Sequence, residues 1–124
     1  MLYPKDIEAQ LSSFKKPEHL TALREGYWIS DGIQYLITHT YSEWLLAKIL
    51  KWMRQSPDLR LQRFQIFVLK VDLESRSAVL EAQNEERQVI RKEHIEFTDF
   101  PLPWGSIWVK DKILMLPSEF AHSF

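Results

Sequence analysis

The spacing of apolar side chains changes near residue 57, from the period of a helix to the period of a strand. Before this point, apolar positions recur every three or four residues, which places them on one helical face. After it, they alternate with polar residues or form short unbroken runs, as strands do. We therefore predict one α+β domain over residues 1–124, with N-terminal helices in residues 1–56 and a sheet in residues 63–117.

The strongest local signal predicts a helix from Thr40 to about Gln55. Thr40 and Glu43 have the spacing of a capping box, in which each side chain bonds the other residue's backbone amide. Ser56 and Pro57 should end the helix. Seven apolar side chains share one half of its circumference, namely Tyr41, Leu45, Leu46, Ile49, Leu50, Trp52 and Met53. We expect this half to face the core.

Three weaker helices are predicted before it. Residues 5–13 carry acids in the first turn, where the helix dipole favours them. A second short helix would open at Pro17 and end at Gly26 in a left-handed conformation. A third would begin at Ser30 or Asp31, because either residue is a good N-cap.

About five strands are predicted in the C-terminal half. The first, Phe64–Leu73, is apolar on both faces, as central strands are. Ser77–Ala82 and Gln88–Phe97 follow after short turns, and Ser106–Leu116 should form a hairpin. Such short connections favour one antiparallel meander, on which the helices would pack. An open edge at the last hairpin would let two copies pair, so we expect a monomer or a homodimer.

Composition narrows the possible partners. The 16 Lys and Arg residues and 17 Asp and Glu residues give a net charge of −1, too little to attract nucleic acid or anionic lipid to the whole chain. The absence of cysteine excludes disulfides, thiolate chemistry and zinc sites built on sulfur. The sequence shows neither a signal-peptide pattern nor a membrane-spanning apolar run. We expect a cytoplasmic protein with no membrane partner.

The sequence shows no recognisable catalytic, metal or cofactor motif, and we predict none of these sites. The four histidines are too far apart for a helical metal pair, and the three glycines are too isolated for a phosphate loop. Asp99 lies between aromatic residues, where it would be a partly buried acid or would hold the turn into Pro101. Asp31 is either a helix cap or an acid. An enzyme would need both aspartates and His39 in one small pocket.

The 16 aromatic residues favour a role in binding. Trp44, Trp104 and Trp108 are the protein-binding candidates, because aromatic anchors dominate interface hot spots. The leading hypothesis is a small non-enzymatic protein-binding or accessory protein whose partner the sequence does not identify. The alternative is a nucleic-acid-binding module that combines an aromatic side chain with basic ones. Its candidate residues are Trp44, Lys48, Lys51, Arg54 and Arg60.

Several segments resemble a family of short bacterial proteins of unknown function. They are Ser30–Leu36 (SDGIQYL), Trp44–Leu46, Phe67–Val71, Ile95–Leu102 (with FTDFPL) and Leu116–Glu119 (LPSE). In that family an acid often follows the paired leucines, where this chain has Ala47, so a site that uses the acid would be absent or changed. The resemblance covers about residues 14–119 and implies no activity or cofactor. It implies a compact accessory protein from mobile DNA. Within the leading hypothesis, such a protein would modulate or inhibit cellular machinery.

Overall fold

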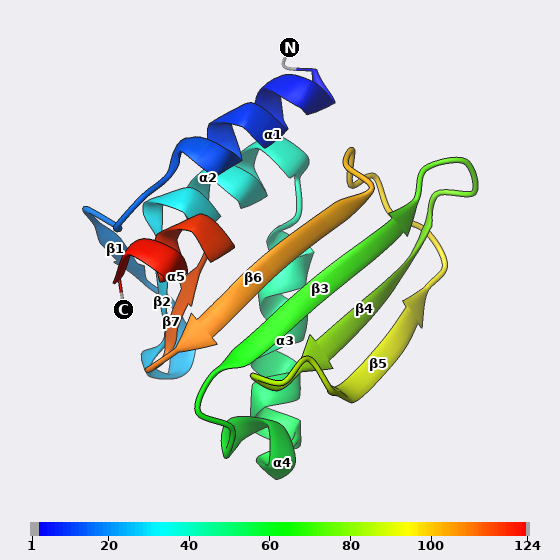
Figure 1. Ribbon diagram of the computed structural model, residues 1–124. Helices are drawn as coiled ribbons and strands as arrows, with labels where there is room; N and C mark the ends of the chain where they lie inside the picture. Colours follow the sequence, from blue (N-terminus) through cyan, green and yellow to red (C-terminus); the bar gives the residue numbers. More distant parts are fainter. Residues whose placement is uncertain (1–2, 124) are drawn as a thin grey trace.

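A computed structural model describes residues 3–123, which form a seven-stranded sheet with five α-helices and one 3₁₀ turn (Figure 1). The helices are α1 (Pro4–Ser13), α2 (Asp31–Thr40), α3 (Glu43–Gln55), α4 (Pro57–Arg60) and α5 (Pro117–Ser123). The strands are β1 (Leu20–Ala22), β2 (Trp28–Ser30), β3 (Gln65–Asp72), β4 (Ser77–Gln83), β5 (Val89–Ile95), β6 (Trp104–Lys110) and β7 (Ile113–Met115). The 3₁₀ turn, η1, spans Arg24–Gly26.

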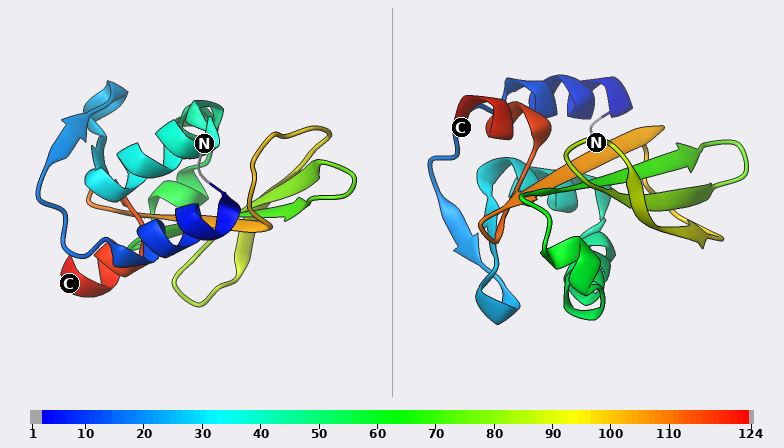
Figure 2. Two further views of the ribbon diagram at one scale, coloured as in Figure 1. Left: turned by 90° about the horizontal axis from the view of Figure 1, so that it is seen from above. Right: turned by 60° about the horizontal axis from the view of Figure 1, so that its bottom comes forward.

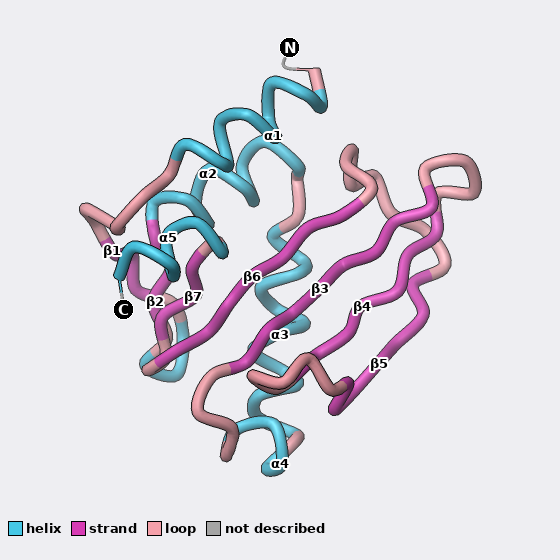
Figure 3. The backbone as a smooth tube through the Cα atoms, in the orientation of Figure 1, coloured by secondary structure: helices cyan, strands magenta, loops and turns pink. Residues whose placement is uncertain are grey.

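The strands are ordered β1-β2-β7-β6-β3-β4-β5 (Figure 3). Among the neighbouring pairs of these strands, only β2 and β7 run parallel to each other. The mixed α and β architecture is as predicted. The prediction of one antiparallel meander with about five strands is wrong, as is the confinement of all helices to the N-terminal part. The N-terminal part supplies β1 and β2, while α4 and α5 come later in the chain.

The segment predicted to form a second helix after Pro17 is instead a small hairpin. β1 pairs with β2 in antiparallel fashion, and the connection turns through Glu25 (φ 62°) and Gly26 (φ 81°). Leu20 and Leu23 have helical spacing, but a helix of two turns has little stability of its own. β2 gains a partner in β7, which lies far along the sequence and leaves no local signal.

Helix α3 packs against the sheet with the apolar face that the periodicity predicts. Leu45, Ile49 and Trp52 are buried, and the ring of Trp52 lies 6.3 Å from that of Phe67 on β3. Figure 1 shows α3 crossing behind the strands. Burial of each large apolar side chain contributes roughly 1.5–3 kcal/mol, so this contact is a main source of stability.

The predicted capping box at the start of α3 is wrong. Thr40 is the last residue of α2, and its hydroxyl donates to the carbonyl of Leu36 at 2.6 Å. Tyr41 then adopts a left-handed conformation (φ 53°) and is 84% exposed, so it does not join the core. Ser42 is the N-cap of α3 and makes no side-chain capping bond, while Glu43 begins the helix. The tight reversal at Tyr41 separates the two helices and overrides the local pattern.

The sheet has an inner and an outer face (Figure 2). Phe67 on β3 faces inward, to α3, while its neighbour Ile66 points to the outer face. Trp108 pairs with Ile66, so it also lies on the outer face, where its ring is 4.7 Å from that of Phe120 on α5. Helices α2 and α3 therefore cover one face, and α5 covers one end of the other.

The last hairpin lies within the sheet rather than at its edge. β6 pairs with β3 and β7, and β7 pairs with β2, so the edge strands are β1 and β5. The predicted route to a homodimer through this hairpin is therefore closed. Among residues 3–123, no helix combines the length and apolar character needed to cross a membrane.

Candidate functional site

The carboxylate of Glu119 joins the C-terminal helix to the start of α2. It is fully buried and accepts hydrogen bonds from the Ser30 hydroxyl (2.5 Å), the Gly32 amide (3.1 Å) and the Leu116 amide (2.9 Å). Ser30 is the N-cap of α2, so one carboxylate supports two helix starts. The bond between Glu119 and Gly32 spans 87 residues and has no local signal in the sequence.

Trp104 is the most exposed of the three tryptophan candidates that we selected for protein binding. It is 51% exposed at the start of β6 and pairs with Lys70 on the outer face of the sheet. Beside it is a groove of about 420 Å³ between α1, β6 and the start of α5. The groove is lined largely by apolar side chains, with Leu36, Leu102 and Leu116 among them, and with Leu11 from α1. An exposed aromatic residue beside an apolar hollow is a typical protein-contact feature.

Trp108 is half-buried and has several neighbours. Its ring stacks on that of Phe64 at 5.6 Å and contacts Phe120, while the guanidinium of Arg87 lies 5.2 Å from its centre. The indole N–H donates to the Ser106 hydroxyl at 3.2 Å. These contacts hold α5 on the sheet, so Trp108 has a clear packing role.

Trp44 lies at the junction of α2 and α3. It is half-buried and lines a separate groove of about 430 Å³ together with Ile37 and Tyr41. Tyr41 is the more exposed aromatic residue there. The sequence did not single it out, because only its left-handed backbone turns it away from the core. The tryptophan candidates therefore do not form one continuous surface: Trp104 has its own groove, Trp108 supports α5 and Trp44 lies beside α2.

The five nucleic-acid candidates are also divided. Trp44, Lys48 and Lys51 share one stripe of α3, and Lys48 forms an ion pair with Glu93 of β5 at 2.6 Å. Arg54 lies on a different stripe. The structure therefore separates Arg54 from the other candidates on this helix.

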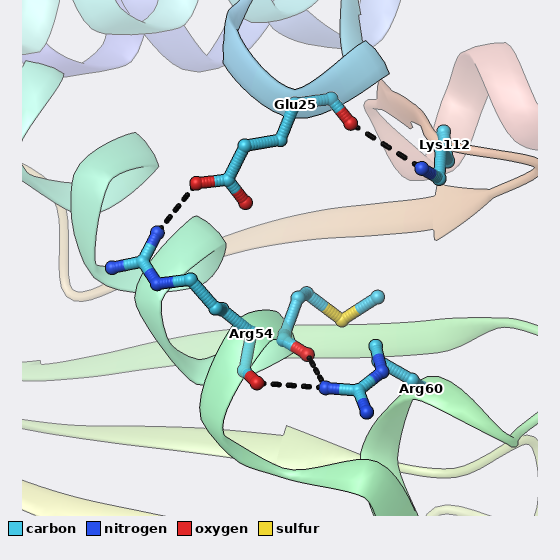
Figure 4. Close-up of polar contacts among 5 residues, drawn as sticks. Glu25, Arg54, Arg60 and Lys112 are labelled. Atoms are coloured by element: carbon cyan, nitrogen blue, oxygen red, sulfur yellow. Dashed lines mark hydrogen bonds and ion pairs between the residues drawn. The ribbon is translucent and has the colours of Figure 1, made fainter.

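Arg54 and Arg60 belong to a charged cluster at the end of α3 (Figure 4). Arg54 forms a 2.6 Å ion pair with Glu25 of η1. Arg60 donates to the carbonyls of Met53 (2.8 Å) and Arg54 (2.7 Å), and so satisfies the C-terminus of α3. Lys112, in the β6–β7 turn, donates to the Glu25 carbonyl at 3.3 Å. The sequence missed Glu25 and Lys112, because they reach this place only through the pairing of β2 with β7.

Tyr27 lies next to this cluster. It is buried, and the ammonium of Lys112 lies 5.3 Å from the centre of its ring. Burial raises the pKa of the Tyr27 phenol, the negative charge of Glu25 raises it further, and the nearby Arg60 opposes both. The phenol is therefore neutral at physiological pH and adds no negative charge to the cluster.

Asp31, His39 and Asp99, the three residues considered for an enzymatic pocket, do not lie together in one pocket. Asp31 accepts from the amides of Glu18 (3.0 Å) and His19 (3.2 Å), which fixes the segment before β1. His39 is eight residues further along α2, about 12 Å along the helix axis. Its ring stacks on Tyr35 at 3.9 Å, within the last turn of α2.

Asp99 is exposed, which rules out the first of its two alternatives, a partly buried acid. The turn into Pro101 is held by Thr98, whose hydroxyl accepts from the Phe100 amide at 3.1 Å. Thr98 and Phe100 are both buried and leave Asp99 between them on the surface. In the part of the chain that the structure describes, no three His, Asp or Glu side chains gather as metal ligands.

The motif segments support one another in space. Glu119 of the Leu116–Glu119 segment binds the start of α2, and Phe100 packs against Gly105, where an added Cβ would lie 2.8 Å from the Phe100 ring.

No curated protein and no solved structure matches the chain. A family model matches residues 5–120, nearly the whole length, and the chain therefore belongs to the family described as "Family of unknown function (DUF6876)".

Proposed function

We propose that this is a non-enzymatic protein-binding protein that uses Trp104 and the groove beside it. The observation that carries the proposal is the 51% exposure of Trp104 at the mouth of a groove with a largely apolar lining. Exposed tryptophan is costly to leave in water and is enriched among the residues that dominate binding energy. Trp108 contributes indirectly, because it holds α5, whose first residues form one wall of the groove.

The groove suits apolar side chains of a partner protein. Its volume of about 420 Å³ is enough for one or two large side chains, and Leu102 and Leu116 beneath it are fixed by the core. Glu8 and Ser12 of α1 supply polar groups at the rim. A rigid apolar centre with a polar rim is the usual arrangement of a protein–protein contact.

The resemblance of residues 14–119 to short bacterial accessory proteins extends the proposal. On that basis, the partner would belong to cellular machinery that this protein modulates or inhibits, and the gene would be carried by mobile DNA. The alternative of nucleic-acid binding through α3 has less support, since Lys48 pairs with Glu93 and Arg54 lies on a different stripe of the helix from Trp44, Lys48 and Lys51.

A comparative capture experiment tests this proposal. The tagged protein, Trp104→Ala and Leu61→Ala would be incubated with lysate from the organism that encodes the chain. Leu61 is a matched control, because it is 83% exposed but follows α4 at the opposite end of β3. We expect wild type and Leu61→Ala to retain the same protein, and Trp104→Ala to lose at least about 90% of it, the effect of roughly 1.4 kcal/mol or more. Equal recovery by all three, or recovery of nucleic acid alone, would contradict the proposal.

A further inference from the structure

A second groove has no lining residue in common with the Trp104 groove. It lies between the β1–β2 hairpin on one side and helices α2 and α3 on the other, and its volume is about 720 Å³. This volume is within the range of about 300–1,000 Å³ that is usual for small-molecule sites. The groove owes its size in part to two small side chains, Ala22 from β1 and Ala47 from α3. A larger residue at either position would occupy it.

This groove has a mixed lining, in which apolar side chains lie between charged ends and Thr21 and Gln34 add polar groups. Its apolar side chains come from the hairpin and both helices: Leu23, Ile29, Ile37, Leu46 and Leu50. Ile29 and Ile37 belong to the core, so this side is rigid. Such a surface binds the hydrocarbon portion of a ligand through the hydrophobic effect.

Charge is distributed unevenly between the two ends of the groove. Glu43, Ala47, Leu50 and Arg54 form one stripe of α3, so Glu43 and Arg54 are 11 residues and about 16 Å apart. Arg24 also lines the Arg54 end. Arg60 donates to the backbone carbonyl of Arg54, and Lys112 donates to that of Glu25, so both lie next to this end of the groove (Figure 4). This end therefore carries four cations, Arg24, Arg54, Arg60 and Lys112, and the carboxylate of Glu25 pairs with Arg54.

This end can accept an anion at little cost. Arg54 is paired with Glu25, but the side chains are 56% and 42% exposed, and ion pairs as exposed as this contribute little to stability. Arg24 is exposed and makes no ion pair with the residues that the structure describes. A ligand anion could therefore take the place of the Glu25 carboxylate on Arg54 and also contact Arg24. Arginine binds carboxylates and phosphates with two parallel hydrogen bonds, which favours such a replacement.

We propose that this groove binds a small amphiphilic acid, whose hydrocarbon chain lies over Ala47 and whose carboxylate or phosphate is held by Arg54 and Arg24. A nucleic-acid strand fits less well, because its charge is spread along its length while the cations here are at one end. A neutral hydrocarbon would fill the groove but leave the arginines without a new partner. The proposal is independent of protein binding at Trp104.

Titration of the ¹⁵N-labelled protein, followed by NMR, tests the inference. The probes are decanoate, decyl phosphate, 1-decanol and inorganic phosphate, each below the concentration at which it aggregates. We expect decanoate or decyl phosphate to shift the amides of Ala22, Ala47 and Leu50. Decanol should bind at least about tenfold more weakly, because it lacks the charge-assisted bonds. Comparison of the two anions shows which head group is preferred, and inorganic phosphate alone should cause no shift at Ala47.

Three variants locate the binding site. Arg54→Gln should weaken decanoate binding about tenfold, and Ala47→Phe should abolish it by filling the groove. Ala47 is exposed, so this variant should keep its fold, which circular dichroism would verify. Trp104→Ala should bind decanoate like the wild type, and this keeps the test separate from the protein-binding proposal. The inference is overturned if neither anion shifts the groove amides, if decanol binds as tightly as decanoate, or if Arg54→Gln and Ala47→Phe both bind like the wild type.

Discussion

Replacement of Gly32 by alanine should destabilise the protein, although helix propensity alone predicts the opposite. Gly32 is the second residue of α2, and alanine is favoured over glycine in a helix by about 1 kcal/mol. An added Cβ would collide with the buried Glu119 carboxylate and would lie 2.6 Å from Leu116 Cδ1. The carboxylate cannot move away without weakening its bonds to Ser30 and Leu116.

The expected size of the effect follows from these contacts. Overpacking of a well-packed site costs about 1–3 kcal/mol. Loss of one hydrogen bond to a charged group costs about 1.5–3 kcal/mol. After subtraction of about 1 kcal/mol for propensity, the net loss is about 1.5–5 kcal/mol. This would be a large fraction of the stability of an ordinary domain.

Urea denaturation followed by circular dichroism would measure this loss. Gln34→Ala is the matched control, because Gln34 is exposed on the same helix, and its free energy of unfolding should change by less than about 0.5 kcal/mol. If Gly32→Ala were as stable as the wild type, or more stable, Glu119 would not be the tight link between the two helices that we describe.

Two further predictions concern β4 and β5. Arg91 lies 4.6 Å from the Trp52 ring and donates to the Ser56 hydroxyl at 2.9 Å, so Arg91→Ala should lower the free energy of unfolding by about 1–3 kcal/mol. His94→Ala, on the outer face of β5, is its control in the same urea titration and should change this energy by less than about 0.5 kcal/mol. Burial raises the pKa of Glu81, but hydrogen bonds from Gln83 and Lys70 outweigh it and leave the pKa below the ordinary value of 4.5. The ionised form therefore stabilises the fold above pH 4.5, and this contribution is lost as the pH falls through the lowered pKa. Glu81→Gln should be less stable than wild type at about pH 6 and should approach it at about pH 3, and an equal difference at both values would refute the assignment.

The main helix could be predicted because its information is local. The apolar side chains between Leu45 and Met53 recur with the helical period, and all six that the helix buries were identified. The start of the helix was misplaced because Thr40 and Glu43 match a capping box by spacing alone. The left-handed turn at Tyr41, which decides the boundary, depends on how α2 and α3 pack.

The sheet was only partly predictable, for a related reason. The hairpins of β3, β4 and β5 have short turns, and the alternation of their side chains appears in the sequence. The pairing of β2 with β7 joins Trp28 to Ile113 and cannot be read from either segment alone. Three-residue strands such as β1 also carry too few positions to show a period.

The sites were the least predictable part. The sequence pointed to Trp104 as an aromatic candidate for protein binding, and the structure places it beside a groove at the start of β6. It did not predict the Arg54–Glu25 pair, since Glu25 reaches Arg54 only after the β1–β2 hairpin folds onto α3. The stripe of Glu43, Ala47, Leu50 and Arg54 on α3 was a signal for the second groove. Ala47 is a small side chain among large ones on this helix face, and such a position can leave a groove on the surface.

Site-specific photocrosslinking at residue 104 tests the central claim most directly. A benzophenone amino acid would replace Trp104 in one variant and Leu61 in the other, and both would be irradiated in cells of the organism that encodes the protein. We predict a discrete protein adduct from position 104 that is missing from position 61. The absence of an adduct at 104, or the same adducts from both positions, would contradict the claim that the Trp104 groove recognises a protein.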